Sequence, residues 1–333
     1  MNRKVLIIAE AGVNHNGSLQ RALEMVDAAV TAGADVIKFQ SFKTDKLVTP
    51  DAPKAAYQEN NTGTSGGQYA MLKKLELDEQ AHIVLMDYCR EKNIAFLSTP
   101  FDPDSAEMLN RLGVEMFKVG SGDLTNLPLL RQLARFGKPV ILSTGMANLM
   151  EIEKALEVIT LAGLPLEKVT VLHANTDYPT PYSDVNLLAM QAIAKRFNVK
   201  VGYSDHTDGI EVPVAAVALG ARVIEKHFTL DRNLEGPDHR ASLEPAELGA
   251  MVRAIRNISE ALGDGQKVPS AGERKNMAAA RKSIVAACNI YKGEQFTEEN
   301  LAVKRPGTGI CPLRWDDIIG TFANRDYRKD ELI

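Results

Sequence analysis

The sequence predicts an α/β protein: a (β/α)8, or TIM, barrel followed by a small second domain at the C-terminal end. Eight short runs of β-branched and other apolar residues recur along the chain, and each is followed by a longer stretch with helical periodicity. The eight units together occupy about 260 residues, near the typical size of this barrel. The runs are almost continuously apolar instead of alternating, as expected for parallel strands buried on both faces.

The predicted strands and helices alternate from the start of the chain to residue 262. Strands are predicted at residues 5–9, 35–39, 95–98, 115–119, 139–143, 169–173, 200–203 and 222–226. Helices are predicted at residues 19–32, 79–92, 105–112, 127–136, 150–162, 185–197, 212–219 and 245–262. Gly33, Gly113 and Gly220 directly follow helical stretches, which is a typical helix stop. A doubly wound sheet is the competing fold, but it would more often show five or six strands and a glycine-rich first turn.

One connection, at residues 41–71, is much longer and more polar than the others. It contains the turn-forming sequences Asn-Asn-Thr-Gly and Ser-Gly-Gly. Loops of this length inside a compact domain are usually functional or disordered. Because it leaves the end of the second strand, where barrel active sites lie, it is predicted to be an active-site flap.

The domain organisation follows from a change of composition after residue 262. We predict a barrel domain at residues 1–265, a linker at residues 266–282 and a small domain at residues 283–333, which contains short strands, turns and one short helix. About fifty residues form a marginal hydrophobic core by themselves, so the small domain is expected to pack on a barrel.

Composition restricts the class of protein. Apolar residues make up 45% of the chain, charged residues 25%, and the formal net charge is −4, which argues against nucleic-acid binding by bulk charge. No run of 18 apolar residues predicts a membrane span, and the apolar stretch near the start is too short for a secretory signal. The three cysteines, Cys89, Cys288 and Cys311, are odd in number and far apart, so a reducing, cytoplasmic location is expected.

The C-terminal ends of the predicted strands form the candidate active site, because the active sites of such barrels are built there. All eight ends carry ionisable or hydroxyl side chains, and this set is more informative than any one member. In chain order they include Glu10, Lys38, Gln40, Thr99, Lys118, Ser121, Asp123, Ser143, Thr144, Asn175, Tyr178, Asp205, His206, Glu225 and His227.

Two of these strand ends predict an anion site. Lys38 and Lys118 lie in apolar strands, and a lysine is a common point charge for phosphate. The small residues nearby would let backbone N–H groups approach phosphate oxygens; they are Ser121, Gly122, Ser143, Thr144 and Gly145. Each lysine could instead be an ordinary loop charge. A Schiff-base lysine of an aldolase is a further alternative, because burial lowers the pKa of an amine.

Two other strand ends predict a metal site. His206 and His227 follow neighbouring strands, which in a parallel sheet are about 4.8 Å apart, so both imidazoles could reach one divalent ion. Asp205, Glu225 and Asp238 could orient the histidines or join them as ligands. The alternative is two histidines with structural roles, and the spacing does not choose between manganese, zinc and iron. His82, on a predicted helix, is expected to be solvated.

Ten stretches spread over the barrel, in order, resemble the sialic acid (nonulosonate) synthase family, which includes N-acetylneuraminate and N,N'-diacetyllegionaminate synthases. They are IIAEAGVNHNG from Ile7, VIKFQSFK from Val36, APKAAYQENNTG from Ala52, FLSTPFD from Phe96, FKVGSGDLTNLP from Phe117, ILSTGMA from Ile141, NTDYPTPYSDVNL from Asn175, GYSDHTDGI from Gly202, EKHFTLD from Glu225 and GPDH from Gly236. KRPGTGICP from Lys304 resembles the family's antifreeze-like (SAF) domain.

The resemblance implies a reaction. Phosphoenolpyruvate would condense with an N-acylated six-carbon aldose and water to give a nine-carbon 2-keto acid and phosphate. The sugar stays open between N-acetylmannosamine and 2,4-diacetamido-2,4,6-trideoxymannose, so the product would be N-acetylneuraminate or diacetyllegionaminate. It also implies a divalent metal, typically Mn²⁺, no organic cofactor, and a domain-swapped homodimer. The alternatives are a Schiff-base aldolase acting through Lys38 or Lys118 and a non-catalytic carbohydrate-binding protein.

The resemblance also implies roles for individual residues. Phosphoenolpyruvate would be held by Lys38, Lys118, Ser121, Ser143, Thr144 and Gly145. His206 and His227 would bind the metal, and Arg305 would reach the partner subunit's site. The sugar would be held, or protons moved, by Glu10, Gln40, Thr99, Asp123, Tyr178 and Asp238. Gly122 and Asn175 complete the predicted binding set, and Glu10, Gln40, Asp123 and His227 are the predicted catalytic residues. Asp123 stands where the family commonly has Glu.

Overall fold

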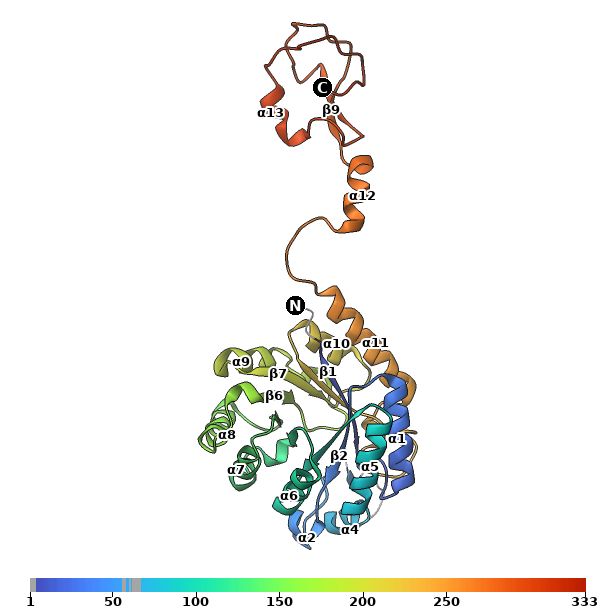
Figure 1. Ribbon diagram of the computed structural model, residues 1–333, viewed down its shortest axis with the longest axis vertical. Coiled ribbons are helices and arrows are strands. Elements are labelled where there is room, and N and C mark those ends of the chain that lie inside the picture. Colours follow the sequence, from blue (N-terminus) through green and yellow to red (C-terminus); the bar gives the residue numbers. More distant parts are fainter. Residues whose placement is uncertain (1–3, 56–57, 60, 62–66) are drawn as a thin grey trace. The chain divides into compact units, whose positions relative to one another are not determined.

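The computed structural model describes residues 4–55, 58–59, 61 and 67–333 (Figure 1). The chain divides into two compact units, Met1–Asp264 and Gly265–Ile333. Each unit has its own apolar core.

The first unit is built on eight parallel strands, which follow one another in the order β3-β2-β1-β8-β7-β6-β5-β4. Residues of β3 and β4, at the two ends of this order, also lie against each other, so the sheet curls round into a barrel. The predicted (β/α)8 barrel is therefore confirmed. The strands are β1 (Leu6–Gly12), β2 (Val36–Ser41), β3 (Ala95–Pro100), β4 (Phe117–Val119), β5 (Val140–Ser143), β6 (Val169–Ala174), β7 (Lys200–Asp205) and β8 (Val223–His227).

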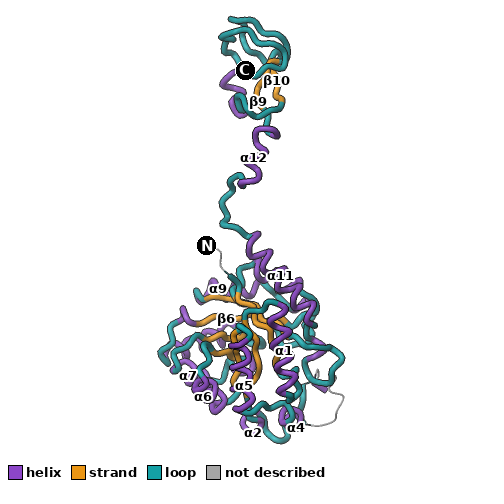
Figure 2. The backbone as a smooth tube through the Cα atoms, turned by 45° about the vertical axis from the view of Figure 1, so that its right-hand side comes forward, coloured by secondary structure: helices purple, strands orange, loops and turns teal. Residues whose placement is uncertain are grey.

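Helices surround the strands on the outside of the barrel (Figures 1 and 2). They are α1 (Leu19–Ala32), α5 (Glu79–Glu91), α6 (Pro103–Leu112), α7 (Leu127–Arg135), α8 (Leu149–Leu161), α9 (Leu188–Phe197), α10 (Glu211–Ala218) and α11 (Pro245–Ala261). Local sequence sets their ends: the Ser18 side chain accepts a hydrogen bond from the backbone of α1, and Gly33 ends that helix in the left-handed region at φ 80°.

Apolar residues fill the barrel below the candidate site. Six strands each contribute one side chain to this inner cluster: Ile8, Val36, Leu97, Ile141, Leu172 and Val223. At Gly202 in β7, a Cβ atom would lie 2.7 Å from the Leu172 side chain and 2.3 Å from the Val223 carbonyl oxygen. The glycine therefore gives the neighbouring strands room to pack, and the apolar side chains fill the barrel interior below its C-terminal end.

Most strands extend one to three residues further toward their C-terminal ends than the sequence predicted. Glu10, Gln40, Thr99 and His227 consequently lie inside strands instead of after them. The apolar pattern stops where the polar site begins, although the backbone ladder continues. Pairing of Glu10 with both Lys38 and His227 places three candidate residues side by side across β2, β1 and β8.

The described part of the long connection after β2 includes the short helices α2 (Thr44–Leu47) and α4 (Gln68–Lys73). An apolar cluster of Val13, Phe42 and Leu75, with Met71 and Leu72 packed on it, joins this connection to the barrel. Part of the predicted flap, at residues 56–57, 60 and 62–66, lies outside the described residues.

The second unit is small and contains α12 (Ala271–Ala280), the antiparallel pair β9 (Ser283–Ala286) and β10 (Leu301–Lys304), and α13 (Trp315–Ile318). Its core includes Ile284, Ile290, Phe296 and Tyr327. Helix α12 lies in the segment that was predicted to be a linker. It forms because Ser270 and Glu273 make a reciprocal capping box at its start.

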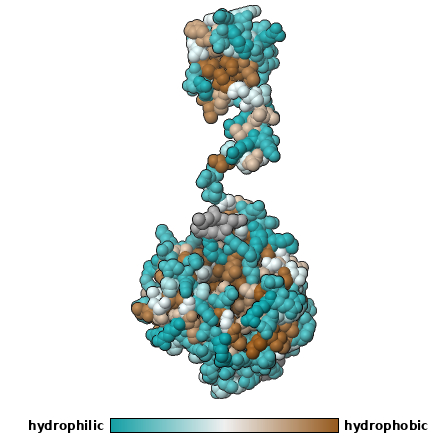
Figure 3. Space-filling view, in the orientation of Figure 1, coloured by the Kyte–Doolittle hydropathy of each residue, from teal (hydrophilic) through white to brown (hydrophobic). Residues whose placement is uncertain are grey.

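The surface of the second unit shows an apolar patch in the space-filling view (Figure 3). The exposed large apolar side chains of the second unit include Leu313 and Phe322. The three cysteines of the chain are free. None of the helices in the described part of the chain has the length and apolar character that crossing a membrane requires.

Candidate active site

A cavity of about 570 Å³ opens at the C-terminal ends of the barrel strands. Many of the residues that the sequence had marked as candidates line this cavity, and they come from several different strands and loops of the first unit. The predicted residues that line it are Glu10, Lys38, Gln40, Thr99, Lys118, Ser121, Gly122, Ser143, Tyr178, His206, His227 and Asp238. This shared cavity is what a site handling two substrates requires.

Two lysines and two carboxylates form a buried cluster at the floor of the cavity. Lys38 Nζ lies 2.8 Å from Glu10 Oε2 and 3.7 Å from Glu225 Oε2. It also donates to Thr99 Oγ1 at 3.0 Å. Lys118 Nζ lies 3.4 Å from Glu225 Oε1, on the other side of the same carboxylate. All four charged side chains are at most 5% exposed, so each depends on the others for compensation of its charge.

The two carboxylates of this cluster have opposite tendencies. Burial raises the pKa of Glu10 to about 7, against the opposing effect of Lys38. Burial would also raise the pKa of Glu225, but Lys118 and Lys38 together lower it to about 2. Glu225 is thus the fixed negative charge that holds both ammonium groups, whereas Glu10 can take up and release a proton near neutral pH.

The pKa values of the two lysines are also shifted in opposite directions. Burial lowers the pKa of Lys118. Burial alone would lower the pKa of Lys38 as well, but the charges of Glu10 and Glu225 outweigh burial and raise it. Lys38 is therefore the firmly protonated member of the pair.

Small polar groups line the cavity beside Lys118. Ser121 begins a short 3-10 turn at Ser121–Asp123, and its Oγ accepts a hydrogen bond from Gly145 N at 3.0 Å. A Cβ atom at Gly145 would lie 2.8 Å from the Thr176 side chain and 2.9 Å from Ser121 Oγ. Ser143 Oγ is buried without a hydrogen-bond partner. An unpartnered buried hydroxyl near two ammonium groups fits an anionic ligand.

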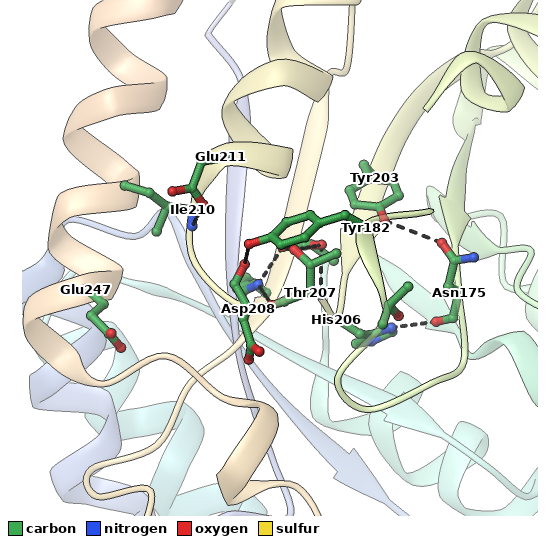
Figure 4. A network of polar contacts seen from close by, with 12 residues as sticks. Asn175, Tyr182, Tyr203, His206, Thr207, Asp208, Ile210, Glu211 and Glu247 are labelled. Atoms are coloured by element: carbon green, nitrogen blue, oxygen red, sulfur yellow. Dashed lines mark hydrogen bonds and ion pairs between the residues drawn. The ribbon is translucent and has the colours of Figure 1, made fainter. Parts of the chain in front are cut away.

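The rings of the two predicted metal ligands lie close to that of Tyr178, which is tilted against His206 and edge-on to His227. The ring centroids of His206 and His227 are 5.4 Å apart, and that of Tyr178 is 4.2 Å from His206. His206 Nδ1 is 2.6 Å from the carbonyl oxygen of Asn175 (Figure 4). Because a carbonyl only accepts hydrogen bonds, Nδ1 carries the proton and Nε2 keeps a free lone pair.

The environment of the histidine pair fits a divalent ion. Burial lowers the pKa of His206 to about 4 and that of His227 well below its usual value, so both imidazoles are neutral, the form that binds metal. His227 Nδ1 is buried without a hydrogen-bond partner. Among the described residues, no group of three or more His, Cys, Asp or Glu side chains is placed to hold a metal. An ion bound here would take its remaining ligands from substrate or water.

Asp238 is a further acid at the mouth of the cavity, and burial raises its pKa to about 6. It follows β8 in the loop that leads to α11, and its backbone carbonyl accepts a hydrogen bond from Ser242. A carboxyl group held here can hydrogen-bond a sugar hydroxyl either as donor or as acceptor.

Several predicted residues do not line the cavity. Asp123 accepts a hydrogen bond from Asn126 at 2.9 Å within its own turn, and burial raises its pKa. Thr144 Oγ1 donates to the Leu172 carbonyl, and Gly145 N donates to Ser121 Oγ. The Asn175 side chain donates to the Asp184 carbonyl. The next residue, Thr176, lines the cavity where Asn175 had been predicted. Arg305 lies in the second unit.

An apolar wall on one side of the cavity was not predicted from the sequence. Its residues come mainly from the long connection after β2 and are Val13, Leu47, Val48, Met71, Leu72, Leu75 and Phe101. Gln58 and Gln68 lie at this side as well, and their amide groups are 3.3 Å apart. The helical spacing of Met71, Leu72 and Leu75 was the available signal for a buried face. Below, we call these seven apolar residues the apolar wall.

The expectation that His82 is solvated was wrong. His82 is fully buried on α5, where Nε2 lies 2.6 Å from Ser41 Oγ and Nδ1 lies 2.8 Å from the Asp78 carbonyl oxygen. A histidine with both nitrogens occupied inside the protein has a structural role.

Comparison with known proteins decides the family. Residues 25–267 match the NeuB family and residues 281–333 match the SAF domain. The chain belongs to the NeuB family. Among relatives of this NeuB-family chain, N,N'-diacetyllegionaminic acid synthase from Campylobacter jejuni is 52% identical over 99% of both chains. The protein of the same name from Legionella pneumophila is 48% identical over 95% of this chain and 89% of that protein.

A solved structure supports the same assignment. The N-acetylneuraminic acid (sialic acid) synthetase from Leptospira borgpetersenii, crystallised in complex with citrate, is similar to this chain with a TM-score of 0.72. The two are 38% identical, and the match covers 83% of this chain and 90% of that protein. The resemblance found in the sequence motifs is thereby confirmed at the level of the family, as is the C-terminal SAF domain.

Proposed function

We propose that this NeuB-family protein is a synthase of the sialic acid type. It condenses phosphoenolpyruvate with an N-acylated six-carbon aldose and water to give a nine-carbon 2-keto acid and inorganic phosphate. The observation that carries this proposal is the presence, in one cavity, of two buried lysines for a phosphate and two neutral histidines for a metal. The names of the relatives from Campylobacter jejuni and Legionella pneumophila agree with it.

The lysine–carboxylate cluster would bind the phosphate of phosphoenolpyruvate. Lys38 and Lys118 supply the positive charge, and Ser143 Oγ supplies a hydroxyl that has no other partner. C3 of the enol then attacks the aldehyde carbon of the sugar, which leaves positive character on C2. Water adds to C2 and passes a proton to Glu10, and the alkoxide formed from the aldehyde takes up a proton. The C2 hydroxyl then releases its proton as the bond between C2 and the phosphate oxygen breaks, which forms the 2-keto group and frees phosphate. The raised pKa of Glu10 suits a group that takes up a proton near neutral pH.

His206 and His227 would hold the divalent metal, for which we propose Mn²⁺. An ion bound here would polarise the aldehyde oxygen and would stabilise the negative charge that develops on it. The protein's own contribution is to keep both imidazoles neutral and to orient His206 through the Asn175 carbonyl.

The sugar that the cavity fits best is 2,4-diacetamido-2,4,6-trideoxymannose. Its C6 is a methyl group, which can pack on the apolar wall, whereas a hydroxymethyl group there would have to reach the amides of Gln58 or Gln68 for a hydrogen bond. Lys38 and Lys118 are the only lysine or arginine residues among the described residues lining the cavity, and residues 55–68 contain neither type. A phosphorylated sugar would therefore find, in the described lining of the barrel cavity, no lysine or arginine beyond the two that hold phosphoenolpyruvate.

A panel of sugars tests this proposal. With phosphoenolpyruvate and Mn²⁺, the diacetamido trideoxy sugar is expected to give the highest kcat/KM, at least about tenfold above N-acetylmannosamine, because a hydroxyl against an apolar wall costs about 1–3 kcal/mol. Phosphate release and product mass are the measurements. N-acetylmannosamine 6-phosphate is the matched control for charge. If none of the three sugars supports phosphate release, the function is refuted, whereas preference for N-acetylmannosamine would refute only the sugar assignment.

The aldolase alternative requires a neutral amine. The charges around Lys38 raise its pKa, so only Lys118, whose pKa burial lowers, is suited to form a Schiff base. Treatment with borohydride in the presence of both substrates is expected to leave the protein unlabelled. Covalent labelling of Lys118 would favour the aldolase.

We further propose a homodimer in which Arg305 serves the site of the partner subunit. The support is the family resemblance and the exposed position of Arg305, whose Nε donates to the Ala280 carbonyl within its own unit. A guanidinium group suits the acyl and hydroxyl oxygens of a sugar. The assignment of the enzyme to the cytoplasm also stays a prediction.

Mixing subunits tests the dimer. Lys38→Ala and Arg305→Ala proteins are each expected to be inactive, and activity is expected to return when the two are mixed under conditions of subunit exchange. One site in a mixed dimer then contains both Lys38 and Arg305. Lack of recovery, with exchange verified by native mass spectrometry, would contradict the proposal. A mixture of each variant with itself is the control.

A further inference from the structure

A buried ion pair lies directly behind the two histidines of the proposed metal site. Lys226 Nζ is 2.5 Å from Asp205 Oδ2, and both side chains are completely buried. Lys226 also donates to the Thr207 carbonyl, and Asp205 Oδ1 accepts from Thr207 N at 3.1 Å and from Thr207 Oγ1 at 2.9 Å. Neither Asp205 nor Lys226 lines the cavity. Any influence that they have on a ligand must therefore pass through other residues.

The position of this pair in the sheet is informative. The parallel ladder between β7 and β8 ends at the register pair Asp205–Lys226. His206 and His227 are the next residue on each strand. The ion pair therefore joins the two backbones at the point where their ladder stops and the histidines begin. Its contacts with Thr207 hold the backbone on the far side of His206 as well, and Figure 4 shows Thr207 and His206 in this loop.

Stability alone does not explain such a pair. Removing two charges from water is costly, and apolar side chains of similar volume often stabilise a protein equally well or better. A fixed distance between two strands is a different property, which an ion pair with defined partners can supply and an apolar contact cannot. It matters here because no group of three or more possible ligands is found among the described residues, so the proposed ion would depend on the spacing of His206 and His227.

We propose that Asp205 and Lys226 are positioning residues that set the separation of His206 and His227 for metal binding. This inference rests on the proposed metal site. The pair tethers β7 to β8, the Thr207 contacts fix the loop after His206, and the two imidazoles are thereby held in place before an ion arrives. Preorganisation of this kind raises the affinity for the metal, because the imidazoles lose less conformational freedom when the ion binds.

The test is Mn²⁺ binding by the full-length protein without substrates, measured by the electron paramagnetic resonance of the free ion. The variant is D205N/K226M, in which the amide oxygen introduced at position 205 can still accept from Thr207 while the link between the strands is gone. We expect its Mn²⁺ affinity to fall about tenfold, as is common when groups that orient metal ligands are removed. An affinity within about twofold of the unaltered protein, with the fold intact by circular dichroism, would overturn the proposal.

A second ion pair in the same barrel is the matched control. Arg256 Nη2 lies 2.6 Å from Asp35 Oδ2, Arg256 also donates to the Val5 carbonyl, and Asp35 accepts from Ile7 N. This pair also has backbone partners, but it is partly exposed, Asp35 pairs with Lys4 as well, and it lies at the N-terminal ends of the strands, away from the cavity. D35N/R256M is expected to lower the melting temperature and leave Mn²⁺ affinity unchanged. An equal loss of affinity in both double variants would show that general stability is responsible, and would overturn the positioning role.

Two further variants separate the possible failures. His206→Ala is expected to lose Mn²⁺ binding; if it binds as well as the unaltered protein, the proposed metal site itself is wrong. If D205N/K226M does not fold, Thr207→Ala is the deciding variant, because it removes both contacts of the Thr207 hydroxyl with Asp205 and keeps the buried charges paired. A loss of more than about twofold in Mn²⁺ affinity supports the positioning role, and no loss overturns it.

Discussion

Replacing His206 or His227 with alanine is expected to lower kcat/KM by about a thousandfold or more. Metal-assisted polarisation of a carbonyl supplies several kcal/mol of transition-state stabilisation, and each 1.4 kcal/mol corresponds to roughly tenfold in rate. The described part of the chain has no group of three or more His, Cys, Asp or Glu side chains that could hold the proposed ion, so the two histidines would be its main protein ligands. Loss of either one leaves a single protein ligand, so affinity for the metal and the rate should fall together. The measurements are initial rates of phosphate release at saturating Mn²⁺.

The control for this prediction is a third histidine at a strand end. His173 lies near the end of β6 outside the cavity, and its Nε2 lies 2.7 Å from the Val185 carbonyl oxygen. His173→Gln can keep this hydrogen bond and is expected to retain activity. Thermal unfolding of all three variants verifies the fold. If His206→Ala or His227→Ala stays active after chelation and removal of metal, the ion has no role in the reaction and the assignment is refuted.

The barrel could be predicted from the sequence because its strands are short apolar runs separated by amphipathic helices. What the apolar pattern could not give was the last residues of each strand. Glu10, Gln40 and His227 continue the ladder although they are polar, because their side chains serve the cavity and not the core. A prediction from apolar residues therefore ends a strand too early wherever polar site residues continue it.

Two errors at the level of single residues have different causes. His82 was expected in solvent, yet Leu85, Met86 and Cys89 follow it at three, four and seven positions on the buried face of α5. This helical spacing was present in the sequence and predicts burial. Asn175 was expected in the cavity, but the backbone after β6 directs Thr176 there instead. A loop has no repeating pattern of apolar residues from which the direction of one side chain could be predicted.

The apolar wall could not be foreseen in the same way. Its members come from the turn after β1, the long connection after β2 and the loop after β3, and they meet only when the barrel closes. The strand-end rule finds charged and polar groups, which carry the chemistry, but not the loop residues that select among related sugars. Reaction class is thus easier to predict from sequence than substrate identity.

Lys118→Met and Lys38→Met are each expected to raise the KM for phosphoenolpyruvate by roughly ten- to a hundredfold. A hydrogen bond from a charged group to phosphate is worth about 1.5–3 kcal/mol. The KM for the sugar should change far less, because the sugar is proposed to bind at the histidine and apolar sides of the cavity. The affinity for inorganic phosphate, measured by isothermal titration calorimetry, should fall in parallel with that for phosphoenolpyruvate.

The two lysine variants are also expected to differ from each other. Lys118→Met leaves Glu225 with Lys38 at 3.7 Å, whereas Lys38→Met removes the ammonium group that contacts both Glu10 and Glu225. Two buried carboxylates then share a single cation, Lys118, so Lys38→Met should be the less stable protein and should lose more activity. Lys138→Met, which removes a lysine from the opposite end of the barrel beside β5, is the control and should leave both KM values unchanged. Unaltered saturation by phosphoenolpyruvate in both Lys38→Met and Lys118→Met would mean that the cluster is structural, and the phosphate would have to be bound elsewhere.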